Sequence, residues 1–255
     1  MYIKEYGIEN EKKMLFLPGA FSDYSWYIPV VELLSEQWHI FLVIYDGYHE
    51  PYEKSFISVE HTIDEIIDFI EKKYDQEFDI VYGLSMGGAI ANLIYAYDRL
   101  KINTLIIDGG VSPYRLPYIL TRLILMRDIL GMKILRSSKK IMKMAFPPDR
   151  WLYPWEDEEE AYDESIRFMN RLSHDTIKNC FDSCNNYTMP DELPKNDTKI
   201  YLLYGELERK DMALDIKYFR KIYPKAIYEE FADTDHGELS TIKYKEFMKF
   251  ISSIN

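Results

Sequence analysis

The sequence predicts an α/β protein built on a doubly wound, mostly parallel sheet. Short apolar runs alternate with amphipathic segments along most of the 255 residues, as strands alternate with the helices that cover both faces of a sheet. The run Ile40–Tyr45 is apolar without interruption, which is typical of a parallel strand buried on both faces. Residues 112–195 contain no such run, so a helical insertion between two strands is expected there.

The first 111 residues alternate regularly. Five apolar runs predict strands, the first of them at an edge, at residues 2–6, 13–17, 40–45, 78–82 and 104–107. Three segments with apolar residues at helical spacing predict helices, at residues 26–34, 63–74 and 86–97. This order is the βαβ repetition of an open parallel sheet.

The second half of the chain first departs from this pattern and then resumes it. The insertion predicts helices only, at residues 126–144, 162–172 and 176–184. Strands follow at 199–204 and 226–231, with helices at 212–222 and 239–251. We expect one domain of residues 1–255. Its core comprises residues 1–111 and 196–255, and residues 112–195 form a helical cap over the carboxyl ends of the strands.

Composition excludes several classes of protein. A net charge of −12 argues against general nucleic-acid binding, which needs a basic surface. The longest apolar region, residues 116–135, is broken by four charged residues, so no integral membrane segment is expected. The N-terminus does not resemble a signal peptide, which favours a cytoplasmic location. Cys180 and Cys184 suggest neither a disulfide framework nor a metal site, and no cofactor is expected.

One short stretch carries the strongest functional signal. Gly83, Ser85 and Gly87 form a G-x-S-x-G pattern between an apolar strand and a helix. A serine at such a sharp turn has a strained backbone, and its neighbours must be small to let strand and helix pack closely. The following helix N-terminus points N–H groups toward charge that develops at the serine. This setting favours a nucleophile over an ordinary glycine-rich turn.

Other polar groups follow the ends of later strands. Glu208 follows the strand at 199–204, and Asp235-His236-Gly237 follows the strand at 226–231. Together with the serine turn and the loop Pro18-Gly19-Ala20-Phe21, these positions resemble the α/β-hydrolase superfamily, of the cap-bearing serine hydrolase or esterase type. The resemblance covers nearly the whole chain outside the insertion. It implies the α/β-hydrolase fold but names no substrate, because this fold hosts many chemistries.

The resemblance implies a role for each of these residues. Ser85 corresponds to the nucleophile, His236 to the general base and Glu208 to the acid that orients the imidazole, in the family's chain order. The backbone N–H groups of Met86 and Ala20 correspond to the oxyanion hole.

Some of these assignments have alternatives. Phe21 is the alternative to Ala20 as oxyanion donor. Asp211 competes with Glu208 because the family acid is more often Asp, and Asp108 is a further alternative. Pro18 stands where the family often has His, which should affect the loop but not the chemistry.

The insertion is locally basic in an acidic chain. Eight basic residues face one acidic residue, Asp128, between positions 115 and 143, and they are Arg115, Arg122, Arg127, Lys133, Arg136, Lys139, Lys140 and Lys143. They form either a solvated face paired with the acidic run Glu156–Glu160, or a site that recruits an anionic group or a lipid surface. The interleaved methionines suit an adaptable pocket for an acyl chain or aromatic group.

These observations predict a carboxylesterase-like serine hydrolase. It would cleave an ester or thioester of a small, partly apolar acyl group through an acyl-enzyme intermediate. One alternative uses the same triad for acid–base chemistry in a lyase or carbon–carbon hydrolase. The other is a ligand-binding relative without catalysis. The expected partner is a small-molecule ester or thioester, and the oligomeric state stays open.

Overall fold

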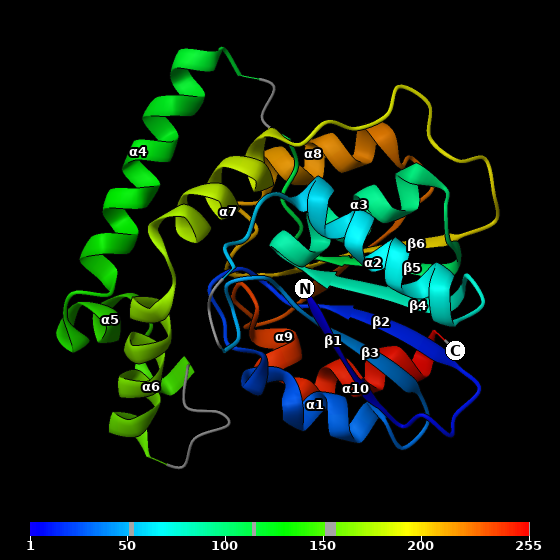
Figure 1. Ribbon diagram of the computed structural model, residues 1–255, viewed down its shortest axis with the longest axis horizontal. Helices are drawn as coiled ribbons and strands as arrows, with labels where there is room; N and C mark the ends of the chain where they lie inside the picture. The colour runs from blue at the N-terminus through cyan, green and yellow to red at the C-terminus, as the bar shows by residue number, and fades with distance from the viewer. Residues whose placement is uncertain (51–53, 114–115, 151–156, 255) are drawn as a thin grey trace.

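The computed structural model describes residues 1–50, 54–113, 116–150 and 157–254 (Figure 1). The described residues form a single seven-stranded sheet in the order β1-β3-β2-β4-β5-β6-β7. The strands are β1 (Tyr2–Tyr6), β2 (Lys13–Leu17), β3 (His39–Ile44), β4 (Glu77–Leu84), β5 (Lys101–Asp108), β6 (Lys199–Gly205) and β7 (Ile227–Phe231). Only the edge pair β1–β3 is antiparallel. The predicted mostly parallel α/β fold is confirmed.

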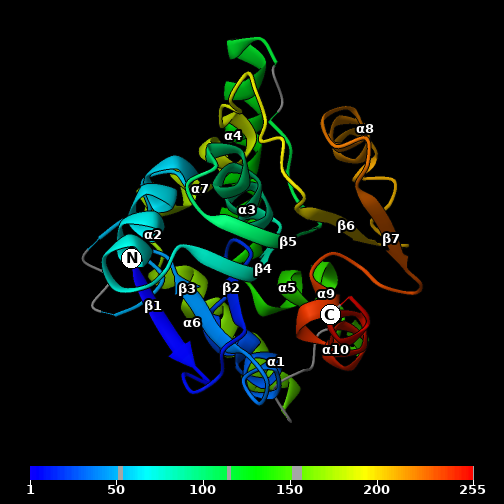
Figure 2. The same ribbon diagram turned by 90° about the vertical axis from the view of Figure 1, so that its right-hand side faces the viewer.

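Helices cover both faces of the sheet (Figures 1 and 2). One face carries α2 (Val59–Lys73), α3 (Met86–Tyr97) and α8 (Ala213–Ile222), and the other carries α1 (Ile28–Leu34), α9 (Glu238–Thr241) and α10 (Tyr244–Ser253).

Successive side chains of a strand enter different cores. Phe41 and Val43 of β3 pack into the core on the α2–α3 face, while Ile40 and Leu42 pack into the core on the α1–α10 face. This two-sided burial explains the uninterrupted apolar run in the sequence.

In the core, two predicted helices differ from the observed ones. The helix predicted at 26–34 begins as a 3-10 turn (Tyr24–Tyr27), which α1 follows. Pro29 lies in the first turn of α1, where a backbone N–H has no acceptor within the helix, so its missing N–H loses no hydrogen bond. The single C-terminal helix predicted at 239–251 is two helices, α9 and α10. They are separated because Ile242 and Lys243 both donate their backbone N–H groups to the Glu238 carbonyl, which ends α9.

The sheet register brings the carboxyl ends of the central strands to one edge. Leu84 at the end of β4 pairs with Asp108 at the end of β5, and Asp108 pairs with Leu203 near the end of β6. Gly205 of β6 then pairs with Phe231 of β7. The residues that follow β4, β6 and β7 therefore lie on the same side of the sheet.

The described part of the chain between β5 and β6 contains helices and no strand, as predicted. The helix expected at 126–144 is divided into two helices, and the first of them begins earlier, at Tyr118. This part of the chain forms α4 (Tyr118–Leu135), α5 (Lys139–Ala145), a 3-10 turn (Pro148–Arg150), α6 (Glu158–Arg171) and α7 (His174–Asn186). We call residues 118–186 the inserted helices. They gather beyond one side of the sheet (Figure 1). Hydrogen bonds join α7 and the residue after it to the core. Asn179 of α7 donates to the Phe56 carbonyl at 2.9 Å, and Tyr187 donates to the Val111 carbonyl at 2.8 Å.

Several basic side chains of the inserted helices form ion pairs within the insertion. Lys143 contacts Glu158 and Glu159, and Lys139 contacts Glu159 at 2.9 Å. A further pair joins Arg122 to Asp182. These contacts favour the interpretation of a basic face neutralised by the neighbouring acidic run. Arg115 and Glu156 lie outside the described residues.

α4 is apolar on two opposite faces. Its inner face is buried through Thr121, Leu125 and Met132. Its outer face exposes apolar side chains at helical spacing, namely Ile119, Leu123, Met126, Leu130 and Ile134. Within the described part of the chain, no helix is long and apolar enough to cross a membrane.

Candidate active site

Ser85 occupies the sharp turn between β4 and α3. Its backbone has φ 53° and ψ −113°, a region that non-glycine residues rarely adopt, and its N–H donates to the Asp108 carbonyl at 2.8 Å. A Cβ atom at Gly83 would collide with the Gly87 carbonyl oxygen, and one at Gly87 would collide with the Leu17 carbonyl oxygen. Close packing around the turn therefore accounts for both glycines of the G-x-S-x-G pattern.

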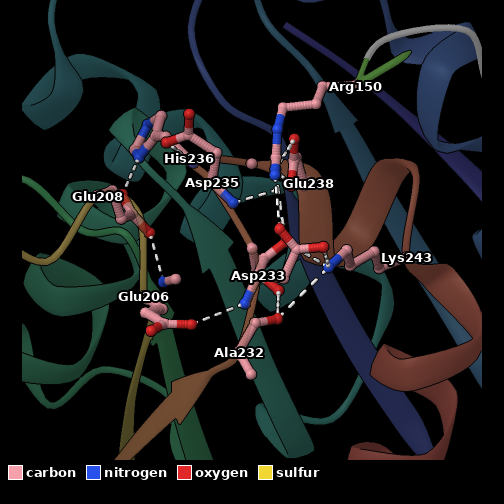
Figure 3. A network of polar contacts seen from close by, with 12 residues as sticks. Arg150, Glu206, Glu208, Ala232, Asp233, Asp235, His236, Glu238 and Lys243 are labelled. Atoms are coloured by element: carbon pink, nitrogen blue, oxygen red, sulfur yellow. Dashed lines mark hydrogen bonds and ion pairs between the residues drawn. The ribbon is translucent and has the colours of Figure 1, made fainter.

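His236 and Glu208 are joined by a short hydrogen bond. His236 Nδ1 lies 2.6 Å from Glu208 Oε2, and the Gly205 N–H donates to Glu208 Oε1 at 2.9 Å (Figure 3). The Glu208 residue is only 4% exposed, whereas the His236 side chain is 44% exposed. Gly109, at φ +52°, makes room for the pair, because a Cβ atom there would lie 2.8 Å from His236 Nδ1.

The charges around His236 favour its protonated form. Burial among protein atoms lowers the pKa of His236, but the hydrogen bond and charge of Glu208 and the charges of Asp108 and Asp235 outweigh it. The pKa is therefore raised above the usual 6.5. In the neutral ring, a proton on Nδ1 donates to Glu208 and leaves Nε2 free to accept another proton.

The two alternative acids are placed differently from Glu208. Asp211 is exposed, and its backbone N–H donates to the Glu208 carbonyl. Asp108 is buried and accepts a hydrogen bond from the Tyr82 hydroxyl at 2.7 Å. Burial, together with the nearby charge of Glu208, raises the pKa of Asp108 to about 7, despite the opposing effects of Tyr82 and His236. Of the three candidate acids, Glu208 is the one that contacts the imidazole.

The two predicted oxyanion donors also lie near the serine. Met86 is the first residue of α3, so its N–H lacks an acceptor within the helix. In the preceding loop, the Gly19 N–H donates to the Tyr27 hydroxyl at 3.2 Å and the Phe21 N–H donates to the Tyr48 hydroxyl at 3.1 Å. Among the described residues, the Ala20 N–H donates no hydrogen bond.

A cavity of about 410 Å³ connects these groups, and Ala20, Ser85 and His236 all line it. Apolar side chains of the inserted helices and the loop after α5 form much of its wall, namely Met132, Leu135, Ala145, Phe146, Pro147, Phe168 and Met169. The methionine-rich sequence indicated such a pocket. It did not identify Phe146 or Phe168, because nothing in the sequence shows which helix face turns inward.

Arg150 is a further residue at the cavity that the sequence did not single out. Its Nη1 lies 3.2 Å from both carboxylate oxygens of Glu238, and its Nη2 lies 2.6 Å from Asp233 Oδ1 (Figure 3). Glu238 is buried, and its Oε2 also accepts the Asp235 N–H at 2.8 Å. Arg150 thus links the inserted segment to the loop that carries His236.

The chain belongs to the alpha/beta hydrolase family, because the family model of that description matches residues 14–247. Comparison with the curated proteins finds no match.

Solved structures share the whole architecture at low sequence identity. An alpha/beta hydrolase family protein from Desulfitobacterium hafniense has a TM-score of 0.71 and 13% identity, with 99% of each chain covered. A structure from a study of carboxylesterases of Nitrososphaera gargenis has a TM-score of 0.70 and 16% identity, over 99% of this chain and 93% of that one. The type II thioesterase BorB of the borrelidin biosynthetic cluster has a TM-score of 0.63 and 13% identity, over 99% and 96%. These similarities establish the fold.

Proposed function

We propose that the protein is a serine hydrolase in which Ser85 is the nucleophile, His236 the general base and Glu208 the orienting acid. One observation carries the proposal. The His236–Glu208 pair and Ser85 line or adjoin one cavity, although three separate strands supply them. The strained backbone of Ser85 supports it further, because such strain persists only where the surrounding packing maintains it.

The arrangement suits acyl transfer. His236 Nε2 would take the Ser85 proton as the oxygen attacks the substrate carbonyl, while Glu208 stabilises the imidazolium through Nδ1. The N–H groups of Ala20 and Met86 would stabilise the oxyanion. His236 then returns the proton to the departing alcohol or thiol, which leaves the acyl group on Ser85. A water molecule, deprotonated by His236, releases the acid and restores the serine.

The cavity favours an uncharged, partly apolar acyl group, carried as an ester or thioester. Its wall is mainly aliphatic and aromatic, and its volume of about 410 Å³ suits a small substrate. Among the described lining residues, the carboxylates of Asp23, Asp235 and Glu238 outnumber the one arginine, Arg150, so a negative charge on the acyl group would be repelled. We assign residues 112–195 as a cap that determines acyl specificity.

A panel of p-nitrophenyl esters of increasing acyl length, with matched thioesters, tests the proposal. We expect hydrolysis that depends on acyl length and is lost in Ser85→Ala. Hydrolysis that persists unchanged in Ser85→Ala would refute the assignment of the nucleophile. A parent that reacts with a fluorophosphonate but cleaves neither ester nor thioester would favour the lyase or carbon–carbon hydrolase alternative. A parent inert to both would favour a ligand-binding protein.

A further inference from the structure

Side-chain hydroxyls hold the backbone of residues 18–22, which we call the oxyanion loop. The Gly19 N–H donates to the Tyr27 hydroxyl, and the Ser22 hydroxyl donates to the Gly19 carbonyl at 3.1 Å. Since this uses the only proton of the Ser22 hydroxyl, Tyr27 donates its own proton to Ser22 Oγ, 2.8 Å away. The three hydrogen bonds form a closed ring that includes the backbone of Gly19. Next to it, the Tyr45 hydroxyl donates to the Pro18 carbonyl at 2.8 Å.

Tyr48 holds the other side of the same loop. Its hydroxyl accepts the Phe21 N–H at 3.1 Å and lies 3.3 Å from Cys180 Sγ on α7. Phe21 has φ +60°, a conformation that costs free energy for a residue with a side chain and must be maintained by its surroundings. Its ring also packs on Phe181 of α7, with the ring centroids 4.7 Å apart. The Tyr48 hydroxyl therefore connects the strained residue to the inserted helices.

The tyrosine hydroxyls determine which backbone N–H of the oxyanion loop is left to bind a substrate oxygen. The N–H groups of Gly19 and Phe21 are both used by tyrosines, and among the described residues only Ala20 of these three has an N–H without an acceptor. Ala20 also lines the cavity with Ser85. Burial raises the pKa of both Tyr27 and Tyr48, so both hydroxyls stay neutral and keep their bonds at ordinary pH.

We propose that Tyr27 and Tyr48 are positioning residues that hold the oxyanion loop so that Ala20, and not Phe21, offers its N–H to the substrate oxyanion. The inference rests on the proposed function and deepens it. It also accounts for Pro18 at the position where a histidine is common. The hydroxyls of Tyr27, Tyr45 and Tyr48 fix the loop without a side-chain donor at residue 18.

Tyrosine-to-phenylalanine variants test this directly, because they remove one hydroxyl and keep the buried ring. We expect Tyr48→Phe and Tyr27→Phe to lower kcat for a p-nitrophenyl ester about 10-fold or more, within the ~10²- to 10³-fold cost of losing an oxyanion donor outright. KM should change less than 2-fold or so, because a bond formed only in the transition state is weakened. The rate of fluorophosphonate labelling should fall in parallel, since that adduct also places an oxygen in the oxyanion hole.

Tyr223→Phe is the matched control. Its hydroxyl is also buried and hydrogen-bonded, to Asn92 Oδ1, but it does not line the cavity. It should lose comparable stability in a thermal melt while retaining the parent kcat. Ser22→Ala removes a partly exposed hydroxyl from the same ring of hydrogen bonds. Its kcat tests the positioning role if Tyr27→Phe does not fold.

The outcomes separate this inference from the proposed function. If the parent reacts with the probe and Tyr48→Phe, Tyr27→Phe and Ser22→Ala all keep its kcat, the positioning role is wrong and the serine hydrolase assignment stands. An equal loss of kcat in Tyr223→Phe would show a general structural effect and also overturn the positioning role. If the parent itself does not react, the proposed function fails and this inference fails with it.

Discussion

Glu208→Gln is expected to inactivate the protein without unfolding it. Glu208 Oε1 accepts the Gly205 N–H at 2.9 Å, so the glutamine amide oxygen should keep that place and direct its NH₂ group at His236 Nδ1. The imidazole would then have to accept at Nδ1 and carry its proton on Nε2. A ring in that tautomer cannot take the proton of Ser85.

The size of the effect follows from this change of tautomer. An amide in place of the orienting carboxylate of a serine triad typically costs about 10⁴-fold in kcat. Allowing for some residual correct tautomer, we expect a loss of about 10³- to 10⁴-fold, or about 4–5.5 kcal/mol of transition-state stabilisation. The fold should survive, because the Gly205 hydrogen bond is kept and the substitution preserves the side-chain volume.

The assay compares ester hydrolysis by Glu208→Gln and Asp211→Asn, with circular dichroism as the test of folding. Asp211→Asn removes the same charge three residues later, from an exposed side chain, and should retain the parent rate within about 2-fold. A folded Glu208→Gln variant that keeps more than a tenth of the parent kcat would show that Glu208 does not set the tautomer of His236. A large loss in Asp211→Asn would instead identify Asp211 as the acid.

Three further predictions concern the surroundings of the catalytic pair. The parent kcat/KM should rise with pH and reach half its maximum above pH 6.5, because His236 must be neutral to accept a proton and its pKa is raised above that value. Gly109→Ala should lower the free energy of unfolding by about 1–2 kcal/mol and reduce kcat, since its backbone has φ +52° and the new Cβ would lie 2.8 Å from the His236 ring. Arg150→Met should lower the midpoint of urea unfolding, because it leaves the buried Glu238 carboxylate without its charged partner.

Matched variants make these predictions refutable. Gly131→Ala in α4 meets no atom within 4 Å and should not reduce stability or kcat. Arg99→Met breaks an exposed pair with Glu71 and should cost less than about 1 kcal/mol. Effects of Gly109→Ala or Arg150→Met no larger than those of their controls would contradict the packing described here. A kcat/KM that does not change between about pH 5 and 8 would exclude His236 as the base.

The strands were predictable because each depends on local sequence. The run at 40–45 is apolar throughout since both faces of β3 are covered. The contact between Glu208 and His236 was also foreseeable. Each follows the end of a strand, and the ends of neighbouring parallel strands meet at one edge.

Contacts between distant segments could not be read from the sequence. The pairing of Lys139 and Lys143 with Glu159 depends on how α5 and α6 pack, and either interpretation of the basic stretch fitted the spacing. Arg150 reaches Glu238 across 88 positions, and no motif marks it. Tyr48 lies 27 positions from the loop residue that it holds, in the loop after β3, and no motif marks it.

The break between α9 and α10 escaped prediction for a different reason. Leu239 and Phe247 are both buried, so the apolar pattern continues through the break. α9 ends because two N–H groups donate to one carbonyl. This is a feature of backbone geometry, which the hydropathy pattern does not reveal.

Mapping a covalent fluorophosphonate adduct by mass spectrometry is the sharpest test of whether Ser85 is an activated nucleophile. We expect one adduct per chain, on the peptide that contains Ser85. The adduct should be absent in Ser85→Ala and should form far more slowly in His236→Ala. A parent that forms no adduct, or an adduct that remains in Ser85→Ala, would show that Ser85 is not the activated nucleophile.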